Sequence, residues 1–318
     1  ITVLEGIREE AGDDVRILYS QGCDLYKDKV ENLAWDQDRI SEAVITAENS
    51  DVVILCVGLD ETLEGEEGDT GNSDASGDKV DLHLPKVQEE LIEKVTAVGK
   101  PTIVVLMAGS AIDLNYAQDN CNGILLAWYP GARGGRAIAD LLFGKESPSG
   151  KLPITFYKDL EGMPEFTDYS MKNRTYRYME KEALYPFGYG LTYSDTCVTE
   201  AEVVGEVSAE SDIMLKATVK NNGTVDTDEV VQVYIKDLDS PLAVRNYSLC
   251  GFKRVSLKAG EEKSVEFTIS NKAMNIVDED GNRYIAGKHF RLFAGVSQPD
   301  TRSAELTGHK PAEVEIAL

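Results

Sequence analysis

A cluster of carboxylates follows an apolar run in the first half of this chain. The run is Asp51–Leu59, and the cluster comprises Glu64, Glu66, Glu67 and Asp69. Carboxylates this close in sequence repel one another, and each can hold a neighbour protonated near neutral pH. A carboxyl group with a raised pKa is what a general acid needs to donate a proton to a leaving-group oxygen. In so acidic a chain, the alternative is a solvated surface loop without a chemical role.

Other polar segments give weaker signals. Thr70–Lys79 is rich in oxygen side chains, but it does not match the spacing of an EF-hand calcium loop, so a surface loop is favoured over a metal site. Gly131–Gly135 has the glycines of an anion-binding helix start without GxGxxG spacing, and close helix-sheet packing explains them equally well. Asp278–Asn282 is interpreted as a hairpin turn. We expect no metal and no cofactor.

The elements that must position the carboxylate cluster alternate between apolar runs and helical patterns. Buried strands are predicted over the runs Val15–Ser20, Asp51–Leu59, Thr102–Ala108 and Gly123–Trp128. Helices are predicted over Arg39–Ala47, Leu84–Val98 and Gly135–Phe143. This order is typical of an open, doubly wound, mostly parallel sheet with helices on both faces. Ligands bind beyond the carboxyl ends of the strands in such a sheet, and the carboxylate cluster follows one of those ends.

The second half has the pattern of an all-β domain. Period-2 alternation predicts strands over Ile213–Val219, Glu229–Ile235, Lys263–Ile269 and His289–Ala294. We therefore predict an α/β domain over residues 1–160, an ordered connecting segment over 161–195 and a β-sandwich over 196–318.

Aromatic residues gather near the end of the α/β domain and in the connecting segment. They are Trp128, Tyr129, Tyr176, Tyr178, Tyr185 and Tyr189. Such rings stack well on the apolar face of a sugar, and they also pack in cores and at domain interfaces. For the stretch 185–193 we favour packing.

Composition excludes several classes of function. The 318 residues include 32 Lys and Arg against 56 Asp and Glu, which gives a formal net charge of −24. Such a field repels phosphate backbones and anionic lipids, so neither nucleic acid nor a membrane is expected as a partner. Five widely spread cysteines predict reduced, mostly buried thiols. Together with the lack of a visible signal peptide, they favour a cytoplasmic location.

Ordered motifs run through almost the whole chain. In the first two thirds they are Glu64–Gly68, Gly77–Lys79, Leu84–Gln88, Trp128–Gly135, Pro148–Pro153 and Tyr185–Tyr193. In the last third they are Val219–Gly223, Asp228–Tyr234 and Gly251–Arg254. In this order they resemble glycoside hydrolase family 3, the β-glucosidase and β-xylosidase family, over about residues 1–296. The resemblance is to its C-terminal doubly wound domain and its fibronectin type III-like domain.

The resemblance implies part of a retaining β-glycosidase. That family uses a nucleophilic aspartate on a (β/α)-barrel and an acid/base glutamate on the doubly wound domain. Carried onto this chain, the acid/base role falls on Glu66 or Glu67, and Glu64 and Asp69 are implied as substrate-binding neighbours. No segment here resembles the one that carries the nucleophile, and the opening strand of the doubly wound domain is missing too. The implied partner is therefore a barrel domain on the same polypeptide or on another chain.

The implied substrate is a β-linked glucoside or oligosaccharide, hydrolysed at its terminal non-reducing glucose. A β-xylosidase of the same family and a non-catalytic carbohydrate-binding or interaction module are the alternatives. Retaining hydrolysis needs two carboxyl groups about 5 to 5.5 Å apart, so the chain alone is expected to be inactive.

Overall fold

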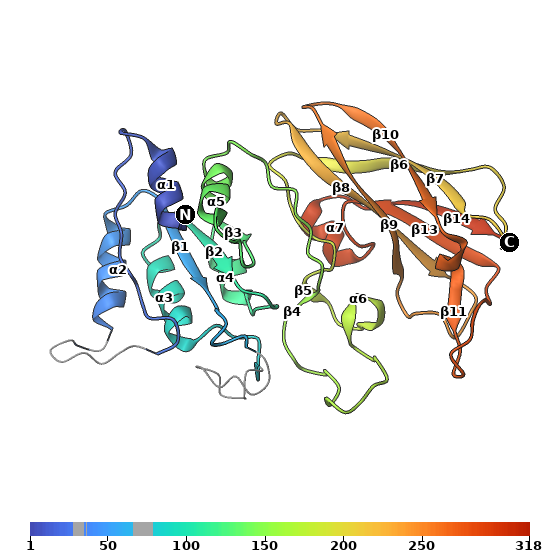
Figure 1. Cartoon of the computed structure of the whole chain (residues 1–318), viewed down its shortest axis with the longest axis horizontal. Helices are drawn as coiled ribbons and strands as arrows, with labels where there is room; N and C mark the ends of the chain where they lie inside the picture. Colours follow the sequence, from blue (N-terminus) through green and yellow to red (C-terminus); the bar gives the residue numbers. More distant parts are fainter. Residues whose placement is uncertain (28–34, 36, 66–78) are drawn as a thin grey trace. The chain divides into compact units, whose positions relative to one another are not determined.

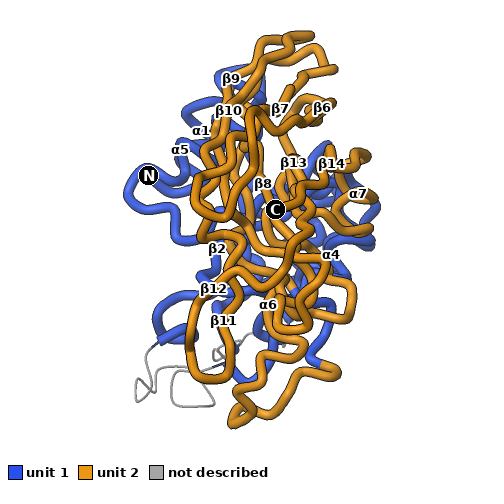
Figure 2. Tube along the Cα trace, turned by 90° about the vertical axis from the view of Figure 1, so that its right-hand side faces the viewer, with its two compact units in different colours: residues 1–145, 157–160 blue, residues 146–156, 161–318 orange. Residues whose placement is uncertain are grey.

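A computed structural model describes the chain except for residues 28–34, 36 and 66–78 (Figure 1). The described residues form two compact units (Figure 2). Unit 1 comprises residues 1–145 and 157–160, and unit 2 comprises residues 146–156 and 161–318. The connecting segment predicted over 161–195 therefore lies within the second unit, with the strands that follow it. No helix among the described residues is long and apolar enough to cross a bilayer.

A parallel sheet forms the centre of unit 1. Its strands are β1 (Val53–Gly58), β2 (Thr102–Met107) and β3 (Gly123–Leu126), and they lie side by side in that order. The register aligns Val53 with Thr102 and Ile103 with Gly123. These strands confirm three of the four predicted for the first half. Their β-branched and leucine-rich sequences suit strands that are covered on both faces.

Helices cover both faces of this sheet. They are α1 (Val3–Ala11), α2 (Asp38–Glu48), α3 (Lys86–Thr96), α4 (Asn115–Asn120) and α5 (Gly134–Leu142). α1 and α5 pack together on one face, where Val3 and Ile138 form a core with Val105 of β2. α2 and α3 pack together and α3 contacts β1, which buries Leu91 and Val95 (Figure 1). Because neighbouring residues of a strand point to opposite faces, the two groups of helices cover alternate side chains. The doubly wound class is confirmed.

The strand predicted over Val15–Ser20 is wrong. This stretch has no strand structure, and Val15 and Tyr19 are 48% and 60% exposed. A strand requires a neighbour for its backbone hydrogen bonds, and apolar composition does not provide one. Within the described residues, no strand pairs with this stretch.

The sequence analysis did not predict α1, although its start carries a capping box. The Thr2 amide donates to Glu5 Oε2 at 2.7 Å, and the Glu5 amide donates to Thr2 Oγ1 at 3.2 Å. This Thr-x-x-Glu pattern is a sequence-level helix start.

The cysteines are less buried than predicted. Cys197 is buried, whereas Cys56 of β1 is exposed and Cys23, Cys121 and Cys250 are half-buried.

Unit 2 is a sandwich of two antiparallel sheets. One sheet has the order β10–β7–β6 and the other β14–β13–β8–β9. The strands are β6 (Thr196–Val204), β7 (Ile213–Asn221), β8 (Thr227–Asp237), β9 (Ser248–Leu257), β10 (Glu262–Ile269), β13 (His289–Gly295) and β14 (Ala312–Ala317). Every second residue of β7 is buried, as expected where only one face of a sheet meets the core. All four strands predicted for this half are present, and the sandwich is confirmed.

Short elements complete unit 2. They are β5 (Ala183–Tyr185), α6 (Thr175–Tyr178), a 3-10 helix (Asn271–Met274), β11 (Asn275–Val277), β12 (Arg283–Ile285) and α7 (Thr301–Thr307); the short strand β4 (Phe156–Tyr157) pairs with β5. The predicted hairpin turn joins β11 and β12, where the Asp278 amide donates to the Asn282 carbonyl at 3.1 Å. Tyr176 stacks on Phe187 with ring centroids 4.3 Å apart, so this tyrosine is used in packing.

Candidate active site at the edge of the parallel sheet

The loops that follow β1, β2 and β3 meet around one carboxylate. Glu64 follows β1, Gly109 and Ser110 follow β2, and Tyr129 follows β3. The Gly109 amide donates to Glu64 Oε2 at 2.7 Å, the Tyr129 hydroxyl donates to the same oxygen, and the Ser110 hydroxyl donates to Oε1. The carboxyl ends of parallel strands share one edge of the sheet, which is where ligands bind in this fold class. The Glu64 carboxylate therefore joins all three strand ends at that edge.

The backbone around Glu64 is shaped to bring these groups together. A Cβ atom added to Gly109 would lie 2.8 Å from Cε2 of Tyr129 and 3.2 Å from Glu64 Oε2, so the close approach requires glycine. Trp128, directly before Tyr129, has φ of 51°, in the left-handed region. That conformation costs a non-glycine residue about 1–3 kcal/mol, and such strain concentrates at functional sites.

Lys79 brings the chain back to the same edge. Its ammonium donates to Ser110 Oγ at 3.0 Å and to the Ala111 carbonyl at 3.2 Å. Burial lowers the pKa of Lys79, and the nearby carboxylates oppose that effect. Glu64 and Lys79 stand on either side of residues 66–78 in the sequence. Both flanks of that segment are thus bonded to the loop that follows β2.

Opposing effects set the protonation state of Glu64. Burial raises the pKa of its carboxyl group, but the hydrogen bonds from Ser110, Tyr129 and Gly109, helped by the charge of Lys79, outweigh burial and hold that pKa below its usual value. Burial and the bond to Glu64 raise the pKa of the Tyr129 hydroxyl. At neutral pH Glu64 is therefore an ionised acceptor, and Tyr129 is a neutral donor.

Gln88 of α3 fixes the end of β1. Its Oε1 accepts from the Gly58 amide at 2.7 Å, and its Nε2 donates to the carbonyls of Gly58 and Leu25, each at 2.7 Å. The side chain is 3% exposed, so an unpaired backbone group there would be costly. The motif Leu84–Gln88 thus anchors the strand end from which the carboxylate loop departs.

The sequence predictions for this site have different outcomes. Glu66, Glu67 and Asp69 lie outside the described residues, so their roles stay predictions. Glu64 lies at the predicted edge of the sheet, and its substrate-binding role also stays a prediction.

Sequence reasoning missed two partners of Glu64. Tyr129 was considered only as a stacking or packing ring, and Ser110 was assigned no role. The available signal was position, because both residues come within three residues of the end of a predicted strand.

Within Gly131–Gly135, Gly135 has a packing role, whereas Gly131 has a φ of 72° and an added Cβ there would meet nothing within 4 Å. A Cβ atom on Gly135 would lie 2.0 Å from the Thr2 carbonyl oxygen, and one on Gly6 would lie 2.2 Å from the Gly135 carbonyl oxygen. These contacts join α1 to α5. Close packing thus accounts for the glycine at 135, but its partner is a helix and not the sheet.

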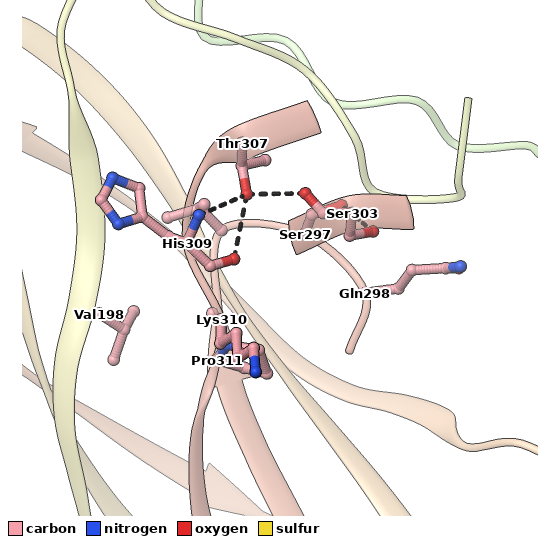
Figure 3. A pocket seen from close by; sticks show the side chains of 10 residues that line it. Val198, Ser297, Gln298, Ser303, Thr307, His309, Lys310 and Pro311 are labelled. Carbon is pink, nitrogen blue, oxygen red and sulfur yellow. Dashed lines mark hydrogen bonds between the residues drawn. The ribbon is translucent and has the colours of Figure 1, made fainter. Parts of the chain in front are cut away.

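A small pocket lies in unit 2, near the ends of α7 and β13 (Figure 3). The Thr307 hydroxyl can donate to the carbonyl of Ser303 at 2.8 Å or to that of His309 at 3.1 Å, and it accepts from the His309 amide at 3.3 Å. These polar groups already bond to one another, which does not favour a sugar site. Within the described parts of the chain, no three His, Cys, Asp or Glu side chains are grouped to hold a metal ion.

Comparisons with known proteins agree with this architecture. A model of the glycosyl hydrolase family 3 C-terminal domain matches residues 1–193, and a model of the fibronectin type III-like domain matches residues 229–298. A β-xylosidase of Formosa agariphila is 34% identical over 315 residues, which cover 96% of this chain and 41% of that protein. A xylan 1,4-β-xylosidase of Xylanibacter ruminicola is 39% identical over 270 residues, covering 84% and 31%.

A solved structure gives the same result for the fold. The structure of a β-glucosidase from Erythrobacter marinus matches with a TM-score of 0.82 and 30% identity, covering 100% of this chain and 43% of that one. The chain therefore spans less than half the length of each of these proteins.

Proposed function

Because this chain belongs to glycosyl hydrolase family 3, as its C-terminal domain and fibronectin type III-like domain, we propose that it supplies the acid/base glutamate of a retaining β-glucosidase. The enzyme would hydrolyse terminal non-reducing β-linked glucose from a glucoside or oligosaccharide. The nucleophilic aspartate would come from a (β/α)-barrel domain that this chain does not contain.

One observation supports this proposal most directly. Residues 66–78, here called the acidic segment, are flanked by Glu64 and Lys79. Both flanking residues form hydrogen bonds at the carboxyl edge of the sheet. Glu66 and Glu67 belong to that segment, two and three residues beyond an ionised carboxylate. A nearby negative charge disfavours a second ionisation and raises the pKa of the neighbouring carboxyl group. A carboxyl group protonated near neutral pH is the one able to act as a general acid.

The two steps of retaining hydrolysis assign that group two roles. In the first step the barrel aspartate attacks the anomeric carbon, and the glutamate gives its proton to the departing glycosidic oxygen. In the second step the same glutamate takes a proton from water as the water oxygen displaces the aspartate. Both steps need the two carboxyl groups about 5 to 5.5 Å apart, so the barrel must lie against the carboxyl edge of the sheet.

A β-xylosidase is the second candidate, because the two curated relatives named above are β-xylosidases. The two sugars differ by the hydroxymethyl group on C5. Measuring kcat/KM with the p-nitrophenyl β-glucoside and β-xyloside would decide between the two activities.

Substitution of each candidate glutamate tests the proposal in the active enzyme that contains the barrel. We expect either Glu66→Ala or Glu67→Ala to lower kcat/KM by about 10²–10⁴-fold on an unactivated glycoside, the usual contribution of general acid catalysis. Azide should raise kcat of that variant on an activated aryl glycoside, because azide attacks the glycosyl-enzyme without a general base. Glu48→Ala, at an exposed glutamate of α2, is the matched control. Unchanged kinetics in both variants would instead support a non-catalytic carbohydrate-binding module.

A further inference from the structure

Glu64 and its hydrogen-bond partners have a role that the acid/base assignment does not include. We propose that Glu64, Ser110 and Tyr129 are positioning residues, whose hydrogen bonds hold the start of the acidic segment where its glutamate reaches the glycosidic oxygen. This inference rests on the proposed function. It assigns specific work to residues other than the acid/base glutamate itself.

The hydrogen bonds to Glu64 are several and come from two different loops. Glu64 is half-buried, and its carboxylate accepts one bond from the loop after β2 through an amide, a second from the same loop through the Ser110 hydroxyl, and a third from the loop after β3. A carboxylate has about four acceptor sites, so three are already used. Bonds to an ionised acceptor are roughly twice as strong as neutral ones. The side chain is thus committed to holding the chain, with little capacity left for a sugar hydroxyl.

The backbone that carries the donors to Glu64 has two unusual features. At position 109, glycine is the only residue type that lets the Tyr129 ring approach so closely. Trp128, directly before Tyr129, has a left-handed backbone conformation. Both features incur a conformational cost, and both place a donor on Glu64. Strain of this kind is maintained where a particular arrangement is needed. A surface carboxylate with no positioning task would not require either feature.

Glu64 lies close in sequence to both candidate acid/base glutamates. Glu64 stands two residues before Glu66 and three before Glu67. Fully extended, such a stretch spans at most roughly 3.3–3.6 Å per residue, so fixing Glu64 restricts the candidate glutamates to about 7–11 Å of reach. A misplacement of about 1 Å at a catalytic group costs on the order of 10²-fold in rate. Loss of the hydrogen bonds to Glu64 should therefore slow the acid/base step.

Leaving-group dependence isolates this role from general stability. A 2,4-dinitrophenolate leaves without a proton, whereas an alkyl or sugar leaving group needs the general acid. kcat/KM reports the steps up to formation of the glycosyl-enzyme, so it measures the need for the acid directly. A variant that only misplaces the acid should lose activity on the alkyl glycoside and keep it on the dinitrophenyl glycoside.

The experiment uses the active enzyme with its barrel and the variants Tyr129→Phe, Ser110→Ala and Glu64→Gln. We expect kcat/KM on methyl β-glucoside to fall about tenfold in the first two and about 10²-fold in the third. On 2,4-dinitrophenyl β-glucoside we expect less than about a threefold change in each. Azide should raise kcat of Glu64→Gln on the dinitrophenyl substrate, because base catalysis of the second step is impaired too.

Two further variants keep the result interpretable. Ser110→Thr retains the hydroxyl group and should restore most of the activity on methyl β-glucoside. Tyr116→Phe is the matched control, because Tyr116 bonds to Thr96 Oγ1 at 3.0 Å in the same unit but outside the Glu64 cluster. It should behave as wild type on both substrates.

Three outcomes would overturn the inference. An equal loss on both substrates would show a role in stability alone, and no loss on either would show no role. A higher KM with kcat unchanged would show that Glu64 contacts the substrate. If Glu66→Ala and Glu67→Ala also lack leaving-group dependence, the proposed function itself fails. If one of them shows it and the three cluster variants do not, only the positioning role fails.

Discussion

Two glutamates in this molecule are each the centre of a polar cluster, and the clusters differ in what surrounds them. Glu64 of unit 1 is half-buried and takes its partners from loops at the edge of a sheet. Glu229 of unit 2 lies within β8 and is 1% exposed. Each carboxylate accepts several hydrogen bonds, so the chemistry of the two hubs is similar. The difference is whether the cluster has an open side.

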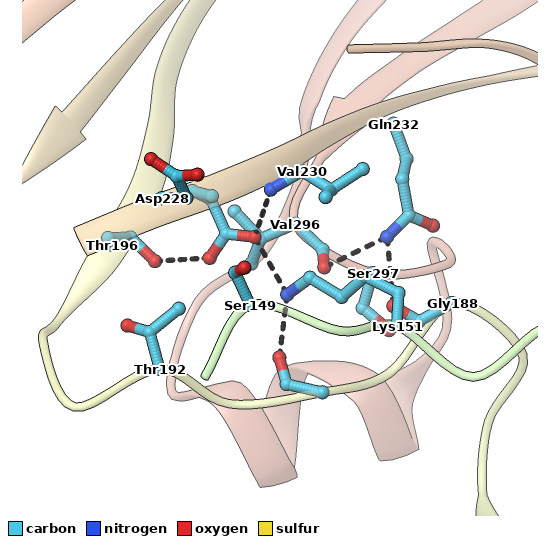
Figure 4. Close-up of polar contacts among 12 residues, drawn as sticks. Ser149, Lys151, Gly188, Thr192, Thr196, Asp228, Val230, Gln232, Val296 and Ser297 are labelled. Carbon is cyan, nitrogen blue, oxygen red and sulfur yellow. Dashed lines mark hydrogen bonds and ion pairs between the residues drawn. The ribbon is translucent and has the colours of Figure 1, made fainter. Parts of the chain in front are cut away.

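The Glu229 cluster has no open side. The Lys151 ammonium lies 2.8 Å from Glu229 Oε1, and the Val230 amide donates to the same oxygen at 2.6 Å. The Thr196 hydroxyl donates to Oε2 at 2.5 Å, and Lys151 also donates to the Gly190 carbonyl at 2.6 Å (Figure 4). Every partner belongs to unit 2. This network fastens the segment 146–156 to the sandwich, and it leaves no group for a ligand.

Polar groups become available for function where a cluster keeps an open side. A buried ion pair enclosed on all sides holds its own unit together, and breaking it leaves an uncompensated charge. A half-buried carboxylate at strand ends binds its loops and still adjoins a segment that carries further carboxylates. Perturbed groups at the edge of a sheet are thus better functional candidates than equally well bonded groups in a core.

Removing one partner of the enclosed pair should have the largest effect on stability. Lys151→Met leaves Glu229 buried without its counter-charge, which costs about 3–5 kcal/mol of the free energy of unfolding. The double variant Lys151→Met/Glu229→Leu should recover most of that loss, because no charge then remains in the core. Denaturant titration followed by far-UV circular dichroism measures both. Lys258→Met, from an exposed pair with Asp226, is the control and should leave stability near wild type, because solvent screens that pair.

A loss of less than about 1 kcal/mol in Lys151→Met would remove the distinction between the two clusters, because the enclosed pair would then behave like a surface pair.

Crowding the Glu64 cluster should have a smaller effect, confined to unit 1. The Cβ atom of Gly109→Ala would lie 2.8 Å from the Tyr129 ring, so the ring and the carboxylate must separate. Overpacking of this kind costs about 1–3 kcal/mol. Gly150→Ala, where an added Cβ meets nothing within 4 Å, is the control and should leave stability near wild type. Equal denaturation midpoints for the two variants would contradict the close approach at Gly109.

The sequence predicted most of the framework on which the two clusters stand. The period of the hydrophobic residues is a local property of the sequence. It was therefore sufficient to locate β1, β2 and β3 and the sandwich strands β7, β8, β10 and β13. Val15–Ser20 has the same local pattern and is not a strand, because pairing depends on a neighbour that the pattern does not contain. Helix α1 contains no long apolar run, and its sequence signal is the capping box at Thr2 and Glu5.

The site could be predicted only to the level of the sheet edge. That the loops after parallel strands meet there is a rule of the fold, and it located Glu64 correctly. Which donors face it depends on backbone conformations such as the φ of 51° at Trp128, and no sequence rule favours that value for tryptophan. The enclosed Lys151–Glu229 pair was likewise invisible, because its partners are 78 positions apart in the sequence.

The smallest effect predicted is a dependence of unit 1 stability on pH. The pKa of Glu64 is below its usual value of 4.5 in the folded state, so its bonds stabilise the fold fully above that pH and less as the pH falls through the folded pKa. Glu64→Gln should therefore destabilise unit 1 at pH 7 by less than about 1 kcal/mol, since solvent screens a half-exposed group. The difference from wild type should shrink as the pH is lowered from 5 to about 3. Unfolding titrations of both proteins across that range measure it, with Glu48→Gln as the control. A difference that grows on acidification would mean that Glu64 is protonated in the folded state. The description of Glu64 as an ionised hub at the sheet edge would then be wrong.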